Sequence, residues 1–292
     1  MRILHLDGGR ELRGGQWQVL RLMEGLAAAG VESTLLARPG APLFAAAREK
    51  GWPVEPLGLA RAFTLARRHD LLHAHDGHGH TVGAIAGRHK LVVSRRVAFP
   101  VRSRFKYRRA RHYLAVSEFV KRVLQAGGVP EENISVVYDG VPLLDPAYGT
   151  LLMAPASEDP QKGAALALEA AQLAGEPLKL SGDLESQLHE AAIFLYITHS
   201  EGLGSGALLA MSAGLPVIAS NVGGLPEIIR HGENGLLVEN RPPEIAAAIV
   251  RLHTSPADAR QLGAAARRTV EERFTVDRMV RRTMEVYRQV LS

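Results

Sequence analysis

Apolar and polar positions follow two alternating patterns along the chain. Short runs rich in Val, Ile and Leu are separated by longer segments in which apolar residues recur at helical spacing. Such alternation is typical of a parallel sheet with helices on both faces. In the first half, the strands predicted are 2–7, 32–37, 54–57, 70–75, 91–94, 112–116 and 134–138, and the helices are 16–29, 42–50, 81–87 and 118–126.

The stretch 139–149 interrupts this pattern with Pro, Gly and Asp, and we place a linker there. A second alternating series follows, and the residues after Pro243 are helical apart from a break near Ser255. We therefore expect a pair of Rossmann-like α/β domains facing a cleft, 1–142 and a smaller 150–292 with a helical tail. The second half is predicted to contain strands 151–154, 178–181, 193–197, 216–219 and 236–238 and helices 163–174, 184–189 and 205–213.

Composition narrows the class of protein. Apolar residues make up 46% and charged residues 22% of the 292 positions, which fits a folded chain with a sizeable core. The absence of Cys excludes disulfides, thiolate metal sites and cysteine nucleophiles. No apolar run reaches the roughly 18 residues that cross a bilayer, and the first residues resemble a strand more than a signal peptide. We expect a cytoplasmic protein.

Positive charge is concentrated in the first half. Residues 1–145 contain 22 Lys and Arg against 13 Asp and Glu, whereas the remainder contains 13 against 17. Two interpretations explain the excess equally well. The basic residues form either a solvated face or a surface that meets anionic headgroups or a polyanionic acceptor. Nucleic acid is not an expected partner, because no matching motif accompanies the charge. Much of the excess lies at Arg95, Arg96, Arg102, Arg104, Lys106, Arg108, Arg109 and Arg111.

Two glycine-rich loops precede predicted helices, where backbone amides favour an anion. The first loop, 8–15, lacks the G-x-G-x-x-G spacing of dinucleotide sites, so NAD is not expected, and a plain turn explains it equally well. The second, 200–211, contains Glu201, whose carboxylate can accept hydrogen bonds from hydroxyls. Further on, Glu227 is either a ligand contact or a carboxylate that stabilises the first turn of a helix.

The segment 201–238 closely resembles the donor-binding half of glycosyltransferase family 4, retaining enzymes with the GT-B fold. Weaker likenesses lie at Gly14-Gly15, 70–75, 115–117 and 136–141. The resemblance implies a nucleotide-sugar donor bound by the second domain, a hydroxyl acceptor bound by the first, and no metal or other cofactor. It also implies front-face transfer with retention, in the synthesis of a cell-surface polysaccharide, lipopolysaccharide or other glycolipid at the inner face of the membrane.

The resemblance assigns roles to particular residues. Glu201 would orient the donor sugar and Lys162 would contact its diphosphate, as the catalytic pair. His75, His80 and Arg96 are acceptor or cleft candidates. The donor-binding candidates are Gly14, Gly15, Gly202, Leu203, Gly204, Ser205 and Glu227.

The sequence departs from the family pattern in the second domain. Leu209 stands where the family has a second glutamate that holds the ribose, and Ser157 stands where it has an arginine. Lys162 and Glu201 are 39 positions apart, which is about one βαβ unit (~30 residues) fewer than usual. A binding or scaffold protein that kept the GT-B fold and lost turnover is therefore the alternative function.

A cluster of histidines supports a third function, a metal-dependent hydrolase. His73, His75, Asp76, His78 and His80 lie close together in the sequence, and imidazole and carboxylate groups suit zinc or another transition metal. Strand alternation places His73 and His75 on one face, while 78–80 are expected in a flexible loop. A polar lining of the cleft is the other interpretation.

Overall fold

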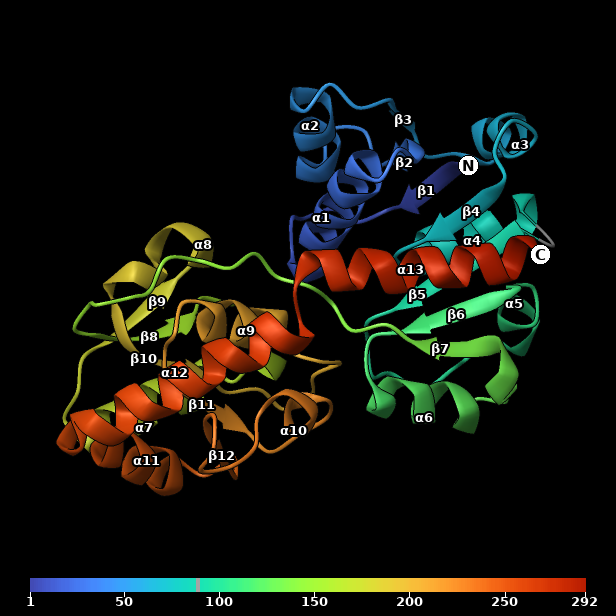
Figure 1. Ribbon diagram of the computed structural model, residues 1–292. Helices are drawn as coiled ribbons and strands as arrows, with labels where there is room; N and C mark the ends of the chain where they lie inside the picture. The colour runs from blue at the N-terminus through green and yellow to red at the C-terminus, as the bar shows by residue number, and fades with distance from the viewer. Residues whose placement is uncertain (88–89) are drawn as a thin grey trace. The chain divides into compact units, whose positions relative to one another are not determined.

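The computed structural model describes residues 1–87 and 90–292, which form two compact units. The first unit comprises Met1–Gly140 and Val276–Ser292, and the second comprises Val141–Thr275. Each unit contains one sheet whose strands are all parallel, with helices packed against it (Figure 1). The α/β class with parallel sheets that the sequence predicts is confirmed.

The first sheet has the strand order β3-β2-β1-β4-β5-β6-β7. Its first six strands follow the Rossmann order, in which the direction of winding reverses between β1 and β4. Buried Val, Ile and Leu residues on both faces explain why these segments form central parallel strands. The strands are β1 (Arg2–Asp7), β2 (Glu32–Ala37), β3 (Val54–Pro56), β4 (Leu71–Ala74), β5 (Leu91–Arg95), β6 (His112–Ala115) and β7 (Ile134–Val136).

The helices of the first unit are α1 (Gly14–Ala28), α2 (Pro42–Glu49), α3 (Leu59–Ala66), α4 (Gly77–Ala86), α5 (Arg104–Tyr107), α6 (Glu118–Ala126) and α13 (Val276–Leu291). Helices α1 and α13 lie side by side over one face of the sheet (Figure 1). Leu22 of α1 and Met279 and Tyr287 of α13 share a core with Ile3 and Leu71 of the sheet.

The position of α13 corrects the expected domain boundary. The sequence analysis assigned all of 150–292 to the second domain, but Val276–Ser292 belongs to the first unit. The reason is packing, because the apolar stripe of α13 completes the core above α1 and the first sheet. Gly25 permits this close approach, since a Cβ there would overlap Val280.

The second sheet has the strand order β12-β11-β10-β8-β9, so its winding reverses between β8 and β10. Strand β9 is an edge strand, and the sheet has one outer strand fewer on this side than the Rossmann order, as the short spacing from Lys162 to Glu201 predicts. The elements are β8 (Leu151–Pro155), β9 (Leu178–Ser181), β10 (Ala191–Tyr196), β11 (Val217–Ser220), β12 (Leu236–Val238), α7 (Ala164–Ala174), α8 (Leu184–Gln187), α9 (Ser205–Ser212), α10 (Leu225–Ile228), α11 (Pro242–Thr254) and α12 (Pro256–Arg273). Short 3-10 turns span Glu131–Asn133, Pro160–Lys162 and Leu188–Glu190.

Helix α4 begins earlier than the sequence analysis expects. Asp76 caps it, because its carboxylate accepts hydrogen bonds from the amides of His78 and Gly79. The expectation of a flexible loop at 78–80 is therefore wrong, since these residues form the first turn of α4. Among the described residues, we find no helix long and apolar enough to cross a bilayer.

Candidate functional site

Lys162 and Glu201 meet where the winding of the second sheet reverses. Lys162 lies in the turn after β8, and Glu201 lies in the loop after β10. Lys162 Nζ is 3.0 Å from Glu201 Oε2, and the two side chains are 39% and 14% exposed. Ligands of open parallel sheets bind outside the carboxyl ends of the strands at such a reversal. The structure thus brings together the two side chains to which the sequence resemblance assigns catalysis.

The carboxylate of Glu201 is held by donors on both oxygens. Oε2 accepts a hydrogen bond from the Tyr196 hydroxyl at 2.9 Å as well as from Lys162, and Oε1 accepts one from the Gly202 amide at 3.0 Å. Burial, with a further contribution from Glu201, raises the pKa of Tyr196 well above its usual value. Tyr196 therefore remains a donor, and Glu201 is fixed as an oriented acceptor.

Backbone contacts fix the two loops to one another. The Thr198 hydroxyl donates to the Gln161 carbonyl at 3.0 Å, and the His199 amide donates to the same oxygen at 2.9 Å. The Thr198 amide donates to Ser220 Oγ of β11 at 2.9 Å. Because Gln161 directly precedes Lys162, these contacts fix the position of the Lys162 backbone relative to the loop that contains Glu201.

Glycines occupy the starts of α7 and α9. Gly163, with φ of +63°, precedes α7, and Gly204, with φ of +108°, precedes α9. A Cβ at Gly163 would lie 2.6 Å from the Ile197 carbonyl oxygen, so glycine is required there for space as well as conformation. The first-turn amides of both helices have no intrahelical acceptor, which suits them to bind an anion.

The other predicted donor-side residues of the second unit lie around this site. Gly202, Leu203 and Gly204 are buried in the loop that leads into α9, and Ser205 is half-buried at its first turn. Glu227 lies half-buried on α10, which approaches this loop closely, since the Gly224 amide donates to the Glu201 carbonyl at 3.2 Å.

The two residues that depart from the family pattern have local roles. Leu209 is 6% exposed and belongs to a run of buried residues, 207–212, that fills most of α9. Ser157 is half-buried, and its hydroxyl accepts a hydrogen bond from the Asp159 amide at 3.2 Å. Neither side chain supplies the charge that the family has at that position.

In the first unit, two carboxylates hold the glycine-rich loop after β1. Asp7 Oδ1 accepts from the Gly9 amide at 2.8 Å, and Asp76 Oδ1 accepts from the Gly8 amide at 2.9 Å. Burial, and secondarily the nearby Asp76, raises the pKa of Asp7 to about 6. The sequence analysis missed Asp7, although its place at the carboxyl end of a strand was a usable signal.

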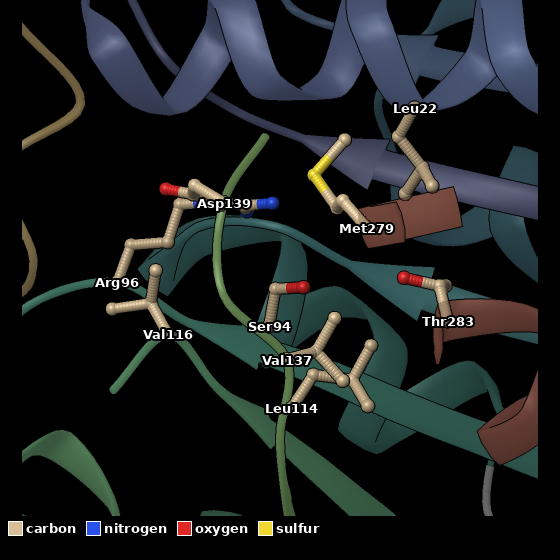
Figure 2. A pocket seen from close by; sticks show the side chains of 9 residues that line it. All are labelled: Leu22, Ser94, Arg96, Leu114, Val116, Val137, Asp139, Met279 and Thr283. Carbon is tan, nitrogen blue, oxygen red and sulfur yellow. The ribbon is translucent and has the colours of Figure 1, made fainter. Parts of the chain in front are cut away.

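Arg96 lies beside the start of α1, where the sequence predicts Gly14 and Gly15 as donor-binding residues. A Cβ at Gly15 would lie 3.9 Å from Arg96 Cδ. Arg96 Nε donates to Asp139 Oδ1 at 2.9 Å, and the two side chains are only 13% and 8% exposed. Both residues line a cavity of about 10 Å³, close to the space of one water molecule (Figure 2).

The histidine cluster is assembled differently from its order in the sequence. His5 of β1 joins His73 and His75, and one ring nitrogen from each lies within 4.8 Å of the others. His78 is exposed, whereas His80 is 2% exposed and packs edge-on against Tyr107 and Tyr113. His80 is therefore a packing residue in this structure.

Protein groups already contact the ring nitrogens of the three clustered histidines. His5 Nδ1 is 2.9 Å from His75 Nε2, and His5 Nε2 is 3.2 Å from a serine hydroxyl. His73 lies between the hydroxyls of Tyr287, at 2.6 Å, and Ser94, at 2.8 Å. His75 Nδ1 faces Arg96. Because the ring nitrogens already have protein partners and the positively charged Arg96 lies beside them, the cluster fits a polar network better than the metal site of a hydrolase.

Two family models and several curated proteins match the chain. The model described as Glycosyltransferase Family 4 matches residues 12–143, and the model described as Glycosyl transferases group 1 matches residues 120–255. Alpha-maltose-1-phosphate synthase of Mycolicibacterium smegmatis is 36% identical over 110 residues, or 35% of this chain and 28% of that protein. D-inositol 3-phosphate glycosyltransferase of Streptomyces bingchenggensis is 33% identical over 110 residues, or 37% of this chain and 24% of that protein. The match thus spans about a quarter of these relatives.

Solved structures resemble the chain over nearly its whole length. Anabaena HepE, crystallised with UDP and glucose, aligns with a TM-score of 0.87 and 18% identity, over 99% of this chain and 100% of that one. Sucrose-phosphate synthase of Thermosynechococcus elongatus aligns with a TM-score of 0.80 and 18% identity, over 99% of both chains. These likenesses show the GT-B fold that the sequence predicts. The two family models, which together match residues 12–255, show that the chain belongs to glycosyltransferase family 4.

Proposed function

We propose that this protein is an active glycosyltransferase that moves a hexose from a nucleoside diphosphate sugar to a hydroxyl acceptor, with retention at the anomeric carbon. The observation that carries the proposal is the Lys162–Glu201 pair at the reversal of the second sheet, beside the starts of α7 and α9. A cation and first-turn amides without an intrahelical acceptor together suit the departing diphosphate, and a fixed carboxylate suits the sugar hydroxyls.

The roles follow from the positions of these groups. Lys162 and the amides at the start of α9 stabilise the negative charge that develops on the leaving diphosphate. Glu201 accepts hydrogen bonds from the sugar and keeps its orientation through Tyr196 and Gly202. The bond from the anomeric carbon to phosphate breaks, the acceptor oxygen attacks from the same face, and its proton passes to the leaving diphosphate. The proposal requires no metal.

A nucleotide panel on the full chain tests the proposal. Thermal unfolding is measured with UDP, GDP, ADP and dTDP, free and sugar-linked, on metal-stripped protein. Anabaena HepE was crystallised with UDP, so UDP is the first choice. A bound ligand at 100 times its dissociation constant adds about 2.7 kcal/mol, which is several degrees. A flat panel on folded protein contradicts donor binding, and the anomeric proton signals of the product test retention.

A binding or scaffold protein without turnover remains the second candidate, because Leu209 and Ser157 remove a carboxylate and a cation from the family pattern. It predicts a flat nucleotide panel, or binding without release of diphosphate from any donor. Donor hydrolysis measured in the absence of acceptor separates the two candidates.

For the acceptor, we propose a cell-surface glycan or glycolipid presented at an anionic membrane. Phe99 and Phe105 are 63% and 67% exposed, and Arg102, Arg108 and Arg111 are exposed in the same segment. Aromatic side chains between cations suit the interface of an acidic bilayer. Co-sedimentation with phosphatidylglycerol vesicles tests this, and equal binding to neutral phosphatidylcholine vesicles would contradict it.

A further inference from the structure

A line of hydrogen bonds leads from Arg96 into the first sheet. Arg96 Nη1 lies 3.5 Å from His75 Nδ1, at the long end of the hydrogen-bond range. His75 Nε2 then lies 2.9 Å from His5 Nδ1, and His5 Nε2 lies 3.2 Å from Ser33 Oγ. His5 and His75 are buried, so this network is part of the interior of the first unit.

The donor at one end determines the protonation of both rings. A guanidinium donates and never accepts, so His75 Nδ1 must be the acceptor. The proton of the neutral His75 ring is then on Nε2 and is donated to His5 Nδ1. His5 in turn has its proton on Nε2 and donates to Ser33. Burial lowers the pKa of His5 to about 3 and that of His75 well below its usual value, which keeps both rings neutral.

Arg96 is thereby held along two edges. Asp139 accepts from Nε at 2.9 Å, and the neutral His75 ring faces Nη1. These contacts engage two of the five N–H groups of a guanidinium. One of the two hydrogen-bond partners is uncharged, although the buried Asp7 carboxylate also lies within electrostatic range of Arg96. The start of α1 lies alongside at Gly15. A planar guanidinium of fixed orientation is suited to bind a phosphate through two parallel hydrogen bonds.

We propose that Arg96 is a pre-oriented phosphate anchor in the first unit, and that Asp139 and the neutral pair His75 and His5 are its positioning residues. The phosphate belongs either to the acceptor or to the donor diphosphate. This assignment of the ligand rests on the proposed function, whereas the anchor itself is measurable without sugar transfer.

Histidine tautomers supply the first test. Long-range ¹H–¹⁵N spectra of the full chain, labelled with ¹⁵N-histidine, are assigned with the variants His5→Gln and His75→Gln. At pH 7 we expect both rings to be neutral with the proton on Nε2. A His75 ring protonated on Nδ1, or on both nitrogens, would overturn the proposal, because it could not accept from Arg96.

A matched pair of substitutions at His75 supplies the second test. The Asn side chain places an oxygen where His has Nδ1, whereas Gln places its polar end where His has Nε2. His75→Asn therefore keeps an acceptor for Arg96, and His75→Gln removes it. Inorganic pyrophosphate is titrated into a parent protein that carries Lys162→Met, so that binding at the second unit does not mask the first. In this parent we expect His75→Gln to raise the dissociation constant about threefold or more, Arg96→Gln to raise it about tenfold, and His75→Asn to leave it near the parent value.

The control is His112→Asn, because His112 is a buried histidine of β6 that bonds to Ser135 at 2.8 Å. This variant should bind pyrophosphate like the Lys162→Met parent. Equal affinity in all four variants and the parent, or equal losses at His75 and His112, would overturn the anchor.

Separate arms identify the source of the phosphate. If Arg96 binds the donor, Arg96→Gln weakens UDP binding. If it binds an acceptor, the variant weakens binding of inorganic phosphate to protein that carries Lys162→Met, and UDP binding to the otherwise wild-type chain is unchanged. Either result supports the anchor. Unchanged binding of both UDP and inorganic phosphate in the Arg96→Gln variants overturns it. A flat nucleotide panel with Arg96-dependent phosphate binding would reject the proposed function alone.

Discussion

Lys162 and Glu201 differ from an ordinary surface ion pair in their surroundings. The Glu201 side chain is only 14% exposed, and Tyr196 and Gly202 also donate to it, so its position is fixed before a ligand arrives. Lys179 and Glu190 form another pair in the same unit, with Nζ 2.8 Å from both carboxylate oxygens and side chains 31% and 36% exposed. This second pair bridges β9 and the turn before β10, away from the two glycine-rich helix starts.

We therefore predict opposite outcomes for the two lysines. Lys162→Met should weaken binding of the nucleoside diphosphate found in the panel by about tenfold or more, because a charge-assisted contact to phosphate is lost. Lys179→Met should leave this affinity unchanged. Isothermal titration of both variants measures the difference, and equal affinities in the two would contradict the assignment of Lys162.

Asp7 gives the first unit a distinctive pH dependence. The pKa of Asp7 is about 6 in the folded chain, against a usual value of 3.8 that applies to the unfolded chain. Between pH 3.8 and pH 6 the native state therefore binds more protons than the unfolded state. The free energy of unfolding contributed by Asp7 therefore falls as the pH rises from about 4 to about 6, by roughly 3 kcal/mol. Above pH 6 Asp7 is ionised in both states, so the destabilisation caused by burying its carboxylate no longer changes with pH.

The variant Asp7→Asn removes this dependence, so its stability relative to the wild type should increase with pH over the same window. Both tryptophans, Trp17 and Trp52, lie in the first unit, so the urea transition followed by tryptophan fluorescence reports on it. A difference between variant and wild type that is constant from pH 4 to pH 7 would show that Asp7 titrates normally.

The sequence identified functional residues where a motif carries them and missed those that depend on strand pairing. Lys162 and Glu201 were found from the residues around them. His5 was not, because its proximity to His73 and His75 comes from the register of β1 against β4, which pairs His5 with His73. Asp139 was noted only as part of a motif, since nothing in its neighbourhood in the sequence indicates contact with Arg96, 43 positions away.

At the scale of elements, periodicity predicted most strands, and the misses have local causes. Helix α3 was not predicted, and it lacks a capping side chain at its start, where Gly58 is the N-cap residue. The start of α4 was missed because its first turn, Gly77 to His80, consists of glycine and histidine, which are poor helix formers. Asp76 compensates by capping that turn and the glycine-rich loop together.

The two ends of α7 offer a matched test of the glycine at the site. Gly163 and Gly175 have nearly the same backbone conformation, with φ of +63° and +73°. A Cβ at Gly175 meets nothing within 4 Å, whereas one at Gly163 would press on the Ile197 carbonyl. We predict that Gly175→Ala destabilises the second unit by about 1 kcal/mol and Gly163→Ala by about 2–4 kcal/mol.

Urea unfolding followed by far-UV circular dichroism measures both values. Gly163→Ala should also reduce the thermal shift caused by the nucleoside diphosphate, because it displaces the residue after Lys162. Similar destabilisation by both variants would indicate that the backbone moves away from Ile197 at little cost.

At the scale of the molecule, the first unit is built from two separate segments of the chain, because the last helix, α13, packs with residues 1–140. The amphipathic pattern of 276–291 shows that one face must be buried, but it cannot show against which sheet, and this is why the sequence analysis placed it in the second domain. Its Tyr287 is fully buried and contacts His73, so the helix also completes the polar network of the first unit.

We predict that a fragment of residues 141–275 folds alone, whereas a fragment of residues 1–140 does not, because Ile3, Leu22, Leu71 and Val92 lose the cover of α13. A peptide of residues 276–292 added to fragment 1–140 should restore cooperative unfolding and native tryptophan fluorescence. A scrambled peptide of the same composition serves as the control. Cooperative folding of fragment 1–140 without either peptide would refute the prediction.

The return of α13 to the first unit reverses the usual order of folding on the ribosome. Domains generally fold as they emerge, the N-terminal one first, at about 5–20 residues per second. Here the second unit is synthesised in full before α13 exists, so the first unit waits roughly 7–30 seconds for its last helix. During that interval its sheet exposes apolar surface to the cell, and the nascent chain should depend on a chaperone bound to residues 1–140 until α13 docks.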